Sequence, residues 1–165
     1  MRIAFVQTYP VYHDGVGTDE WRSLNSREID MAACLARSGH AVEYWAVGRR
    51  EESAGLPGKG EELFPLRVFP PRRFGGLTRN HWSPGLLARA REFRADLHIL
   101  NGLDGGAGTR LLRFYVLPAG AAFGFILGGG HYSRFVPRAR CVFYQSEDQR
   151  VWLEEPGARL WRRAV

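Results

Sequence analysis

The sequence predicts an α/β domain with a doubly wound, mainly parallel sheet. Apolar runs typical of buried strands alternate along the chain with segments of helical periodicity, and no internal repeat is present. The length of 165 residues fits a single domain, which at this size buries about 70% of the surface of its unfolded chain. The hydrophobic content of 45% contains no apolar run long enough to cross a bilayer.

The first strand–helix–strand unit is visible near the N-terminus. Arg2–Gln7 (RIAFVQ) has the continuous apolar pattern of a strand buried on both faces. After a loop, apolar residues recur at helical spacing from Leu24, and Gly39 stands where a left-handed cap ends a helix. Ala41–Val47 (AVEYWAV) is rich in valine and aromatic residues, which predicts the second strand.

The middle of the chain is less regular. Residues 48–63 carry glycines and charges without periodicity, which predicts a flexible loop. Pro65–Pro70 predicts a short or edge strand because prolines bracket it. Ser83 followed by Pro84 predicts the start of a helix, with serine as the N-cap.

The last part of the chain continues the alternation. Further strands are expected at 95–100, 121–127 and 141–145, with a helix at 109–117 between the first two. Ser146 and Gln149 have the spacing of a capping box, which predicts a helix from Ser146. Cys34 and Cys141 lie in apolar patterns and are expected to be small buried side chains rather than a disulfide or a nucleophile.

Four unusual loops follow strands and are therefore expected on one rim of the sheet, where ligands bind in doubly wound folds. These loops span residues 8–21, 101–108, 128–133 and 145–148. In the first loop, Gly15 and Gly17 precede a helix and leave backbone N–H groups uncovered, which favours a phosphate or another anion. The dinucleotide fingerprint Gly-x-Gly-x-x-Gly is absent, so a long surface loop that needs glycine for its turns is the alternative.

Other polar residues are candidates for contacts at this rim. They are His13, Asn101, His131 and Ser146; Ser146 lacks a nucleophile-elbow motif, so capping is its expected role. His98 lies inside a strand and is expected in the core. No cluster of His, Cys and Asp has the spacing of a zinc site, so no metal is expected.

The net charge and the N-terminal residues indicate which partners and which location to expect. The net charge of +6 comes almost wholly from arginine and favours acidic partners: a phosphorylated or nucleotide ligand, an anionic membrane surface, or nucleic acid. No nucleic-acid-binding signature is present, so nucleic acid is not expected. Pro, Trp and Arg residues near 70–82 predict either an acceptor lip or an edge that touches a membrane peripherally. The first residues do not form a signal peptide, which predicts a cytoplasmic location.

The order of these segments resembles the N-terminal domain of glycosyltransferases with the GT-B fold, in particular the large retaining family 4. The likeness is carried by MRIAFVQTYPVYHDGVGTDEW, REIDMAACLARSGHAVEYWAV, LRVFPP, FRADLHILNG and RARCVFYQSEDQRVWLEEPG. Its clearest motif is LARSGHAV, which matches the Leu-Ala-x-x-Gly-His-x-Val helix end of that family. The family usually has two adjacent glycines where this chain has Gly-Val-Gly, and a histidine where this chain has Asn101.

The resemblance implies that residues 1–165 form one Rossmann-like domain, the acceptor-side domain of such an enzyme. It implies that Gly15, Val16, Gly17 and Thr18 face the phosphates of a nucleotide-sugar donor, which is a substrate and not a cofactor. It also implies that His13, Asn101, His131 and Ser146 line the acceptor or sugar cleft. Transfer of the sugar to an acceptor hydroxyl would follow when both substrates are held together.

The family also has a C-terminal donor-binding domain, which is expected to be missing from this chain. An excised domain, one half of a split enzyme with a partner chain, and a degenerate relative that only binds are the three explanations. Without that domain, the chain is expected to be inactive in transfer. The alternative function is a noncatalytic α/β module that binds a phosphorylated ligand or a partner chain.

Overall fold

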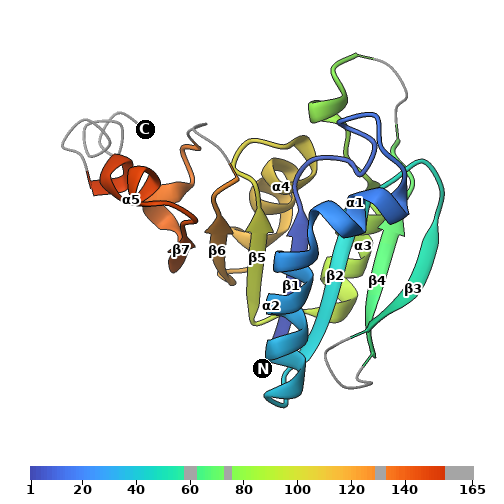
Figure 1. Cartoon of the computed structure of the whole chain (residues 1–165), viewed down its shortest axis with the longest axis horizontal. Helices are drawn as coiled ribbons and strands as arrows, with labels where there is room; N and C mark the ends of the chain where they lie inside the picture. The colour runs from blue at the N-terminus through green and yellow to red at the C-terminus, as the bar shows by residue number, and fades with distance from the viewer. Residues whose placement is uncertain (58–62, 73–75, 129–132, 155–165) are drawn as a thin grey trace.

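The computed structural model describes residues 1–57, 63–72, 76–128 and 133–154. These residues form a seven-stranded sheet with the strand order β3-β4-β2-β1-β5-β6-β7 (Figure 1). The strands are β1 (Arg2–Gln7), β2 (Ala41–Val47), β3 (Glu52–Pro57), β4 (Leu63–Phe69), β5 (Leu97–Asn101), β6 (Ala122–Ile126) and β7 (Cys141–Phe143).

The predicted fold class is confirmed by the strand pairing. Every strand pair is parallel except β3 with β4. Counted along the chain without β3, the six parallel strands lie in the order 3-2-1-4-5-6, which is the Rossmann order. The chain therefore moves from β1 toward one edge of the sheet, returns to the centre at β5, and continues toward the other edge.

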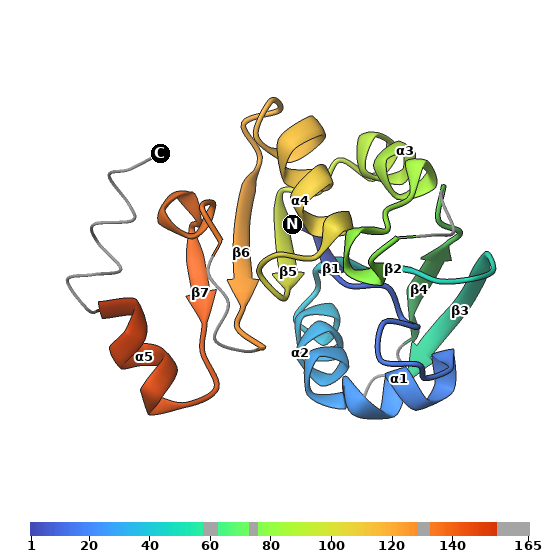
Figure 2. The same ribbon diagram turned by 90° about the horizontal axis from the view of Figure 1, so that it is seen from above.

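Helices cover both faces of this sheet. Figure 2 shows α1 and α2 on one face, and α3 and α4 on the other. The helices are α1 (Thr18–Leu24), α2 (Ser26–Arg37), α3 (Pro84–Phe93), α4 (Gly106–Leu111) and α5 (Glu147–Glu154); the shorter turns are η1 (Thr78–Asn80), the π-helical η2 (Leu112–Val116) and η3 (Val136–Arg138). Among the described helices, none combines the length and apolar character needed to cross a membrane.

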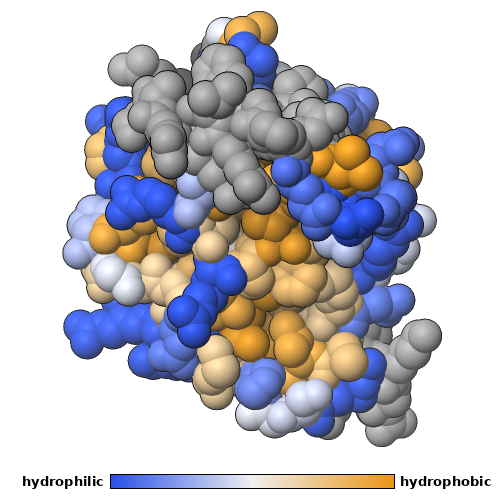
Figure 3. Space-filling model, turned by 90° about the vertical axis from the view of Figure 1, so that its left-hand side faces the viewer, coloured by the Kyte–Doolittle hydropathy of each residue, from blue (hydrophilic) through white to orange (hydrophobic). Residues whose placement is uncertain are grey.

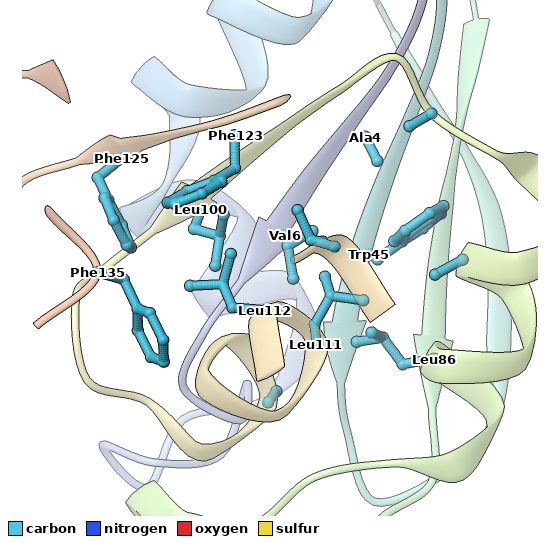
Figure 4. Close-up of a cluster of buried hydrophobic side chains, with 14 of the residues drawn as sticks. Ala4, Val6, Trp45, Leu86, Leu100, Leu111, Leu112, Phe123, Phe125 and Phe135 are labelled. Atoms are coloured by element: carbon cyan, nitrogen blue, oxygen red, sulfur yellow. The ribbon is translucent and has the colours of Figure 1, made fainter. Parts of the chain in front are cut away.

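Alternating side chains of the strands build two cores. Ala4, Val6 and Trp45 point to the face covered by α3 and α4, where they meet Leu86 and Leu111 (Figure 4). The intervening residues belong to the core under α1 and α2, which contains Ile3, Phe5, Tyr44, Trp21 and Ile29. This alternation is the period-two geometry of a strand that is buried on both sides.

Local signals placed several elements correctly. The strands Arg2–Gln7 and Ala41–Val47 have the expected bounds. Ser83 caps α3 by accepting a hydrogen bond from the Gly85 amide at 3.2 Å. Gly39 follows α2 with φ of +84°, a conformation in which a side chain would be strained.

Two expectations about the strands after β2 are wrong. Residues 52–57, expected in a loop, form β3 and pair antiparallel with β4. Consequently β4 lies inside the sheet, between β2 and β3, and is not an edge strand. Pro65 is tolerated there because the pairing of β4 with β2 starts only at Leu66, so the missing N–H of proline interrupts no bond to β2.

Three helix expectations also need correction. The additional helix α1 occupies the end of the expected loop, and α2 begins at Ser26 rather than at Leu24. The helix expected at 109–117 begins three residues earlier, because the glycines of α4 allow it to pack closely on the loop after β1. Cys34, expected to be buried, is exposed, while Cys141 is half-buried; both are free.

The described residues leave apolar side chains exposed at the end of the sheet that carries β7 and α5. Phe143, Tyr144 and Val151 are exposed there. Figure 3 shows apolar surface on this end, bordered by hydrophilic side chains. The strand β7 pairs with β6 and forms one edge of the sheet.

Candidate functional site

The strand order places a candidate site at the carboxyl ends of β1 and β5. Gln7 and Asn101, the last residues of these neighbouring strands, are register partners. The chain leaves β1 toward α2 on one face and leaves β5 toward α4 on the other. Neighbouring connections that diverge in this way open a crevice between strand ends, where doubly wound folds bind their ligands.

A cavity of about 450 Å³ occupies this position. All four of the loops expected at the rim contribute to its lining. The first provides several residues, among them Tyr9, His13 and Trp21; the second provides residues 101–104, the third Gly128 and the fourth Gln145. The expected gathering of these loops is therefore present in the structure. His13 and Asn101, two of the predicted cleft residues, both line the cavity.

The loop after β1 is held in place along its length. Thr8 begins it, with its amide and hydroxyl both donating to the Asn101 carbonyl, at 3.1 and 2.7 Å. Farther along, aromatic and imidazole side chains bond to two other segments: Tyr9 to Asp104, Tyr12 to His81 (2.7 Å) and His13 to Thr78 (2.6 Å). A loop that is tied down at four points presents its side chains to the cavity in a fixed arrangement.

Tyr9 and His13 form an aromatic pair in the wall of the cavity. Their ring centroids lie 4.9 Å apart, with 32° between the ring planes. Burial raises the pKa of the Tyr9 hydroxyl, and its hydrogen bond to the Asp104 carboxylate raises it further. Tyr9 therefore stays protonated at neutral pH and donates to Asp104, which leaves the second carboxylate oxygen of Asp104 available to a ligand.

Carboxamides build the polar part of the cavity. The Asn101 amide Nδ2 donates to Gln7 Oε1 at 2.9 Å and to Asn25 Oδ1 at 3.0 Å. The Gln145 amide Nε2 donates to Glu28 Oε1 at 3.3 Å. These bonds connect the ends of β1 and β5 with the first turn of α2 and with the segment after β7.

The Tyr44 hydroxyl lies close to this polar cluster but outside the cavity lining. It is fully buried, and no described residue offers it a partner that meets hydrogen-bond geometry. Burial raises its pKa; the nearby Asn101 side chain opposes this shift, and the Glu28 carboxylate adds to it.

The predicted phosphate-facing residues lie around a second cavity, of about 340 Å³. Gly15, Val16, Gly17 and Thr18 all line it, together with Arg49 and Arg50. Gly15 needs glycine because its φ is +80°, whereas Gly17 has an ordinary backbone and a Cβ added there would meet open space. Val11 and Val16 line both cavities, so the loop after β1 forms the wall between them.

The two remaining predicted cleft residues are placed differently. Ser146 is exposed, and its hydroxyl accepts a hydrogen bond from the backbone N–H of Gln149 at 3.3 Å. The side-chain oxygen of Gln149 accepts from the backbone N–H of Gln145. Ser146 therefore caps α5, and its neighbour Gln145 is the residue that lines the cavity. His131 lies outside the described residues.

Comparisons of the chain with protein-family models, with curated proteins and with solved structures find no match. The functional argument therefore rests on the chemistry of the two cavities. Within the described part of the chain, no group of three or more His, Cys, Asp or Glu side chains could hold a metal ion.

The two cavities differ in chemistry. The larger one has three carboxylates, Asp14, Glu28 and Asp104, and no arginine or lysine among its described lining residues. The smaller one has Arg49 and Arg50 opposite the single carboxylate Glu52. Carboxylates accept hydrogen bonds from hydroxyl groups, carboxamides both accept and donate them, and arginines favour anions, so the two cavities suit different parts of a reaction or different ligands.

Several lining residues were not found from the sequence. Gln7 carried a signal, since it is the polar end of an apolar strand, but a polar strand end is common. Gln145 lies in the rim loop expected at 145–148, but it was not singled out as a cleft residue. Asn25 and Glu28 carried no signal, because only the packing of the start of α2 beside the ends of β1 and β5 brings them to the same cavity.

Proposed function

We propose that this chain is the acceptor-side domain of a glycosyltransferase that moves a sugar from a nucleotide-sugar donor to an acceptor hydroxyl. The observation that carries the proposal is the polar cavity at the ends of β1 and β5. Its aromatic pair and its carboxylate and carboxamide groups are those with which proteins bind polyhydroxylated rings.

In this proposal the cavity holds the acceptor. Asn101 and Gln7 are fixed by their mutual hydrogen bond and offer their remaining donor and acceptor positions to hydroxyl groups. The ring faces of Tyr9 and His13 contact the apolar face of a sugar. His13 is also the cavity-lining group that can remove a proton from an attacking hydroxyl, with its Nδ1 occupied by Thr78.

The glycine loop would then face the phosphates of the donor, which a second domain on the same or another chain holds. Two features support this part: the space beside Gly17 and the presence of Arg49 and Arg50 in the same cavity. Charge that develops on the leaving diphosphate would be stabilised by these groups.

The proposal predicts that Gly17→Thr lowers transfer. Threonine keeps the capping role of residue 17 and adds bulk where the backbone must approach a phosphate, so we expect at least a tenfold loss of turnover with little change in the midpoint of urea unfolding. The measurement is release of nucleoside diphosphate from a panel of nucleotide sugars, with the donor-binding domain present. Ala119→Val, at an exposed site near the opposite edge of the sheet, is the control and should keep full turnover.

The second candidate is a noncatalytic module that binds a phosphorylated ligand. Arg49 and Arg50 beside the glycine loop favour it, because they need no second domain to bind an anion. Binding of inorganic phosphate or a sugar phosphate without any sugar transfer, in the presence of the donor-binding domain, would support this candidate and exclude the glycosyltransferase.

A further inference from the structure

Glu28 is a buried carboxylate without a charged partner among the residues that the structure describes. It is the third residue of α2, is 6% exposed and lines the larger cavity. Its one hydrogen bond within the described structure comes from the neutral Gln145 amide. Buried glutamates are normally paired with a cation, because an unpaired buried charge is costly. The start of a helix offers only partial compensation.

The described residues that line the cavity supply no positively charged partner for Glu28. The other charged residues that line the cavity are Asp14 and Asp104, both acidic. Arg79 lies near enough to Tyr9 to lower the pKa of its hydroxyl, but it does not line the cavity. In a chain whose net charge is +6, the described lining of this cavity is thus locally acidic.

A second observation points to a ligand at the same place. Trp21 lines the cavity and is 4% exposed, and its Nε1 donor has no hydrogen-bond partner in the described structure. Proteins rarely leave a buried donor unpaired, and this indole N–H would gain a partner if Trp21 turned it toward a hydroxyl group of a ligand in the cavity.

We infer that the larger cavity binds a polyhydroxylated ring that carries an amino group, and that the Glu28 carboxylate holds the ammonium. The acidic lining rejects phosphorylated rings, and the carboxamides of Gln7, Asn101 and Gln145 bind the hydroxyl groups. The identification of this ring as the acceptor rests on the proposed function; its binding by Glu28 does not.

The test is a binding titration followed by two-dimensional NMR on the whole chain. The probes are glucosamine, glucose, N-acetylglucosamine, which lacks the charge, and glucose 6-phosphate. Glucosamine should bind at least fivefold tighter than glucose and N-acetylglucosamine, and the phosphate should bind weakest. Glu28→Gln should remove the preference for glucosamine, while Asp30→Asn, on an exposed position of the same helix, should keep it.

Equal affinity for glucosamine and glucose, a preference that survives Glu28→Gln, or failure of all four probes to bind would overturn the inference. Because glutamine keeps the size of the side chain and an oxygen that can accept from the Gln145 side chain, Glu28→Gln should fold with little change in stability, so loss of binding is separable from loss of structure. Glu28-dependent binding of glucosamine without sugar transfer would contradict the proposed function alone. Equally efficient transfer to an amino-sugar acceptor and to its neutral counterpart, unchanged for both by Glu28→Gln, would contradict this inference alone.

Discussion

Two buried glutamates of this protein have opposite surroundings. Glu43, in the middle of β2, accepts hydrogen bonds from Trp45 Nε1 at 2.7 Å, from Arg67 Nε at 3.2 Å and from Arg89 Nε at 3.0 Å. Glu28, at the start of α2, has one bond from a neutral amide. Where the sheet is closed by α3, the fold itself supplies the counter-charges; at the open ends of the strands it does not.

The pKa of Glu43 reflects this closed environment. Burial raises the pKa, but the hydrogen bonds from Arg89 and Trp45 and the charge of Arg67 outweigh burial and hold it below its ordinary value. The carboxylate is therefore ionised in the folded state and contributes stability above that ordinary value, which is lost as the pH falls through the folded pKa.

The glycines at the rim also divide into enclosed positions and one open position. A Cβ added to Gly106 would lie 2.5 Å from the Asn80 backbone, and one added to Gly105 would overlap the Thr8 carbonyl. Beside Gly17 there is open space. The glycines of the loop after β5 serve close packing, and the glycine that begins α1 leaves space that a ligand can occupy.

The largest expected effect tests whether Glu43 and Glu28 differ in their contribution to stability. Glu43→Gln removes the counter-charge of Arg67 and one of the two carboxylate partners of Arg89, which also pairs with Glu92, and should lower the free energy of unfolding by about 3 kcal/mol. Glu28→Gln should change it by less than about 0.5 kcal/mol or raise it. Urea unfolding followed by circular dichroism measures both. Similar losses in the two variants would show that Glu28 is also a structural residue.

The next effect compares two glycines with the same local role. Gly105 and Gly17 both stand at the N-cap of a helix, where serine is normally favourable. Gly105→Ser should cost about 1–3 kcal/mol, because the backbone of Thr8 would have to move. Gly17→Ser should be neutral within about 0.5 kcal/mol or slightly stabilising. Thermal and urea unfolding of the two variants measure these costs. An equal cost would mean that a side chain at residue 17 also meets neighbouring atoms.

The smallest effect concerns His98, a buried polar side chain beside Trp45 in the core. His98 is fully buried beside Trp45 and Tyr115, and within the described part of the chain neither ring nitrogen has a partner that meets hydrogen-bond geometry. Burial lowers its pKa to about 4, with a smaller opposing contribution from the Ala122 backbone. The unfolded chain therefore binds a proton at a higher pH than the folded one, and stability falls as the pH drops from about 6.5 toward 4.

This linkage predicts a loss of about 2 kcal/mol between pH 7 and pH 5. His98→Leu should flatten the dependence on pH in this window, which lies above the range where carboxylates such as Glu43 titrate. Urea midpoints at pH 7 and pH 5 measure it. His40→Leu, in the turn before β2, controls for the loss of a histidine; if it flattens the dependence as much as His98→Leu does, burial of His98 is not the cause.

Strong local signals made much of the fold predictable. The apolar runs at Arg2–Gln7 and Ala41–Val47, the glycine after α2 and the serine before α3 each act within a few residues of their position. The strand β3 was missed because ESAGLP has no strand pattern of its own and is ordered by pairing with β4. The position of the cavity and the loops that line it were also predictable, because loops that follow parallel strands must lie at one end of the strands.

What the sequence by itself determined is the alternation of strands and helices, the parallel sheet and the edge at which its loops gather, since these follow from periodicity, capping and the handedness of crossover connections. The tertiary structure decided which polar side chains share a cavity and which are neutralised inside the fold. Glu28 and Glu43 cannot be told apart by their local sequence, because the partners that distinguish them, Gln145 for one and Arg89 for the other, are 117 and 46 residues away along the chain.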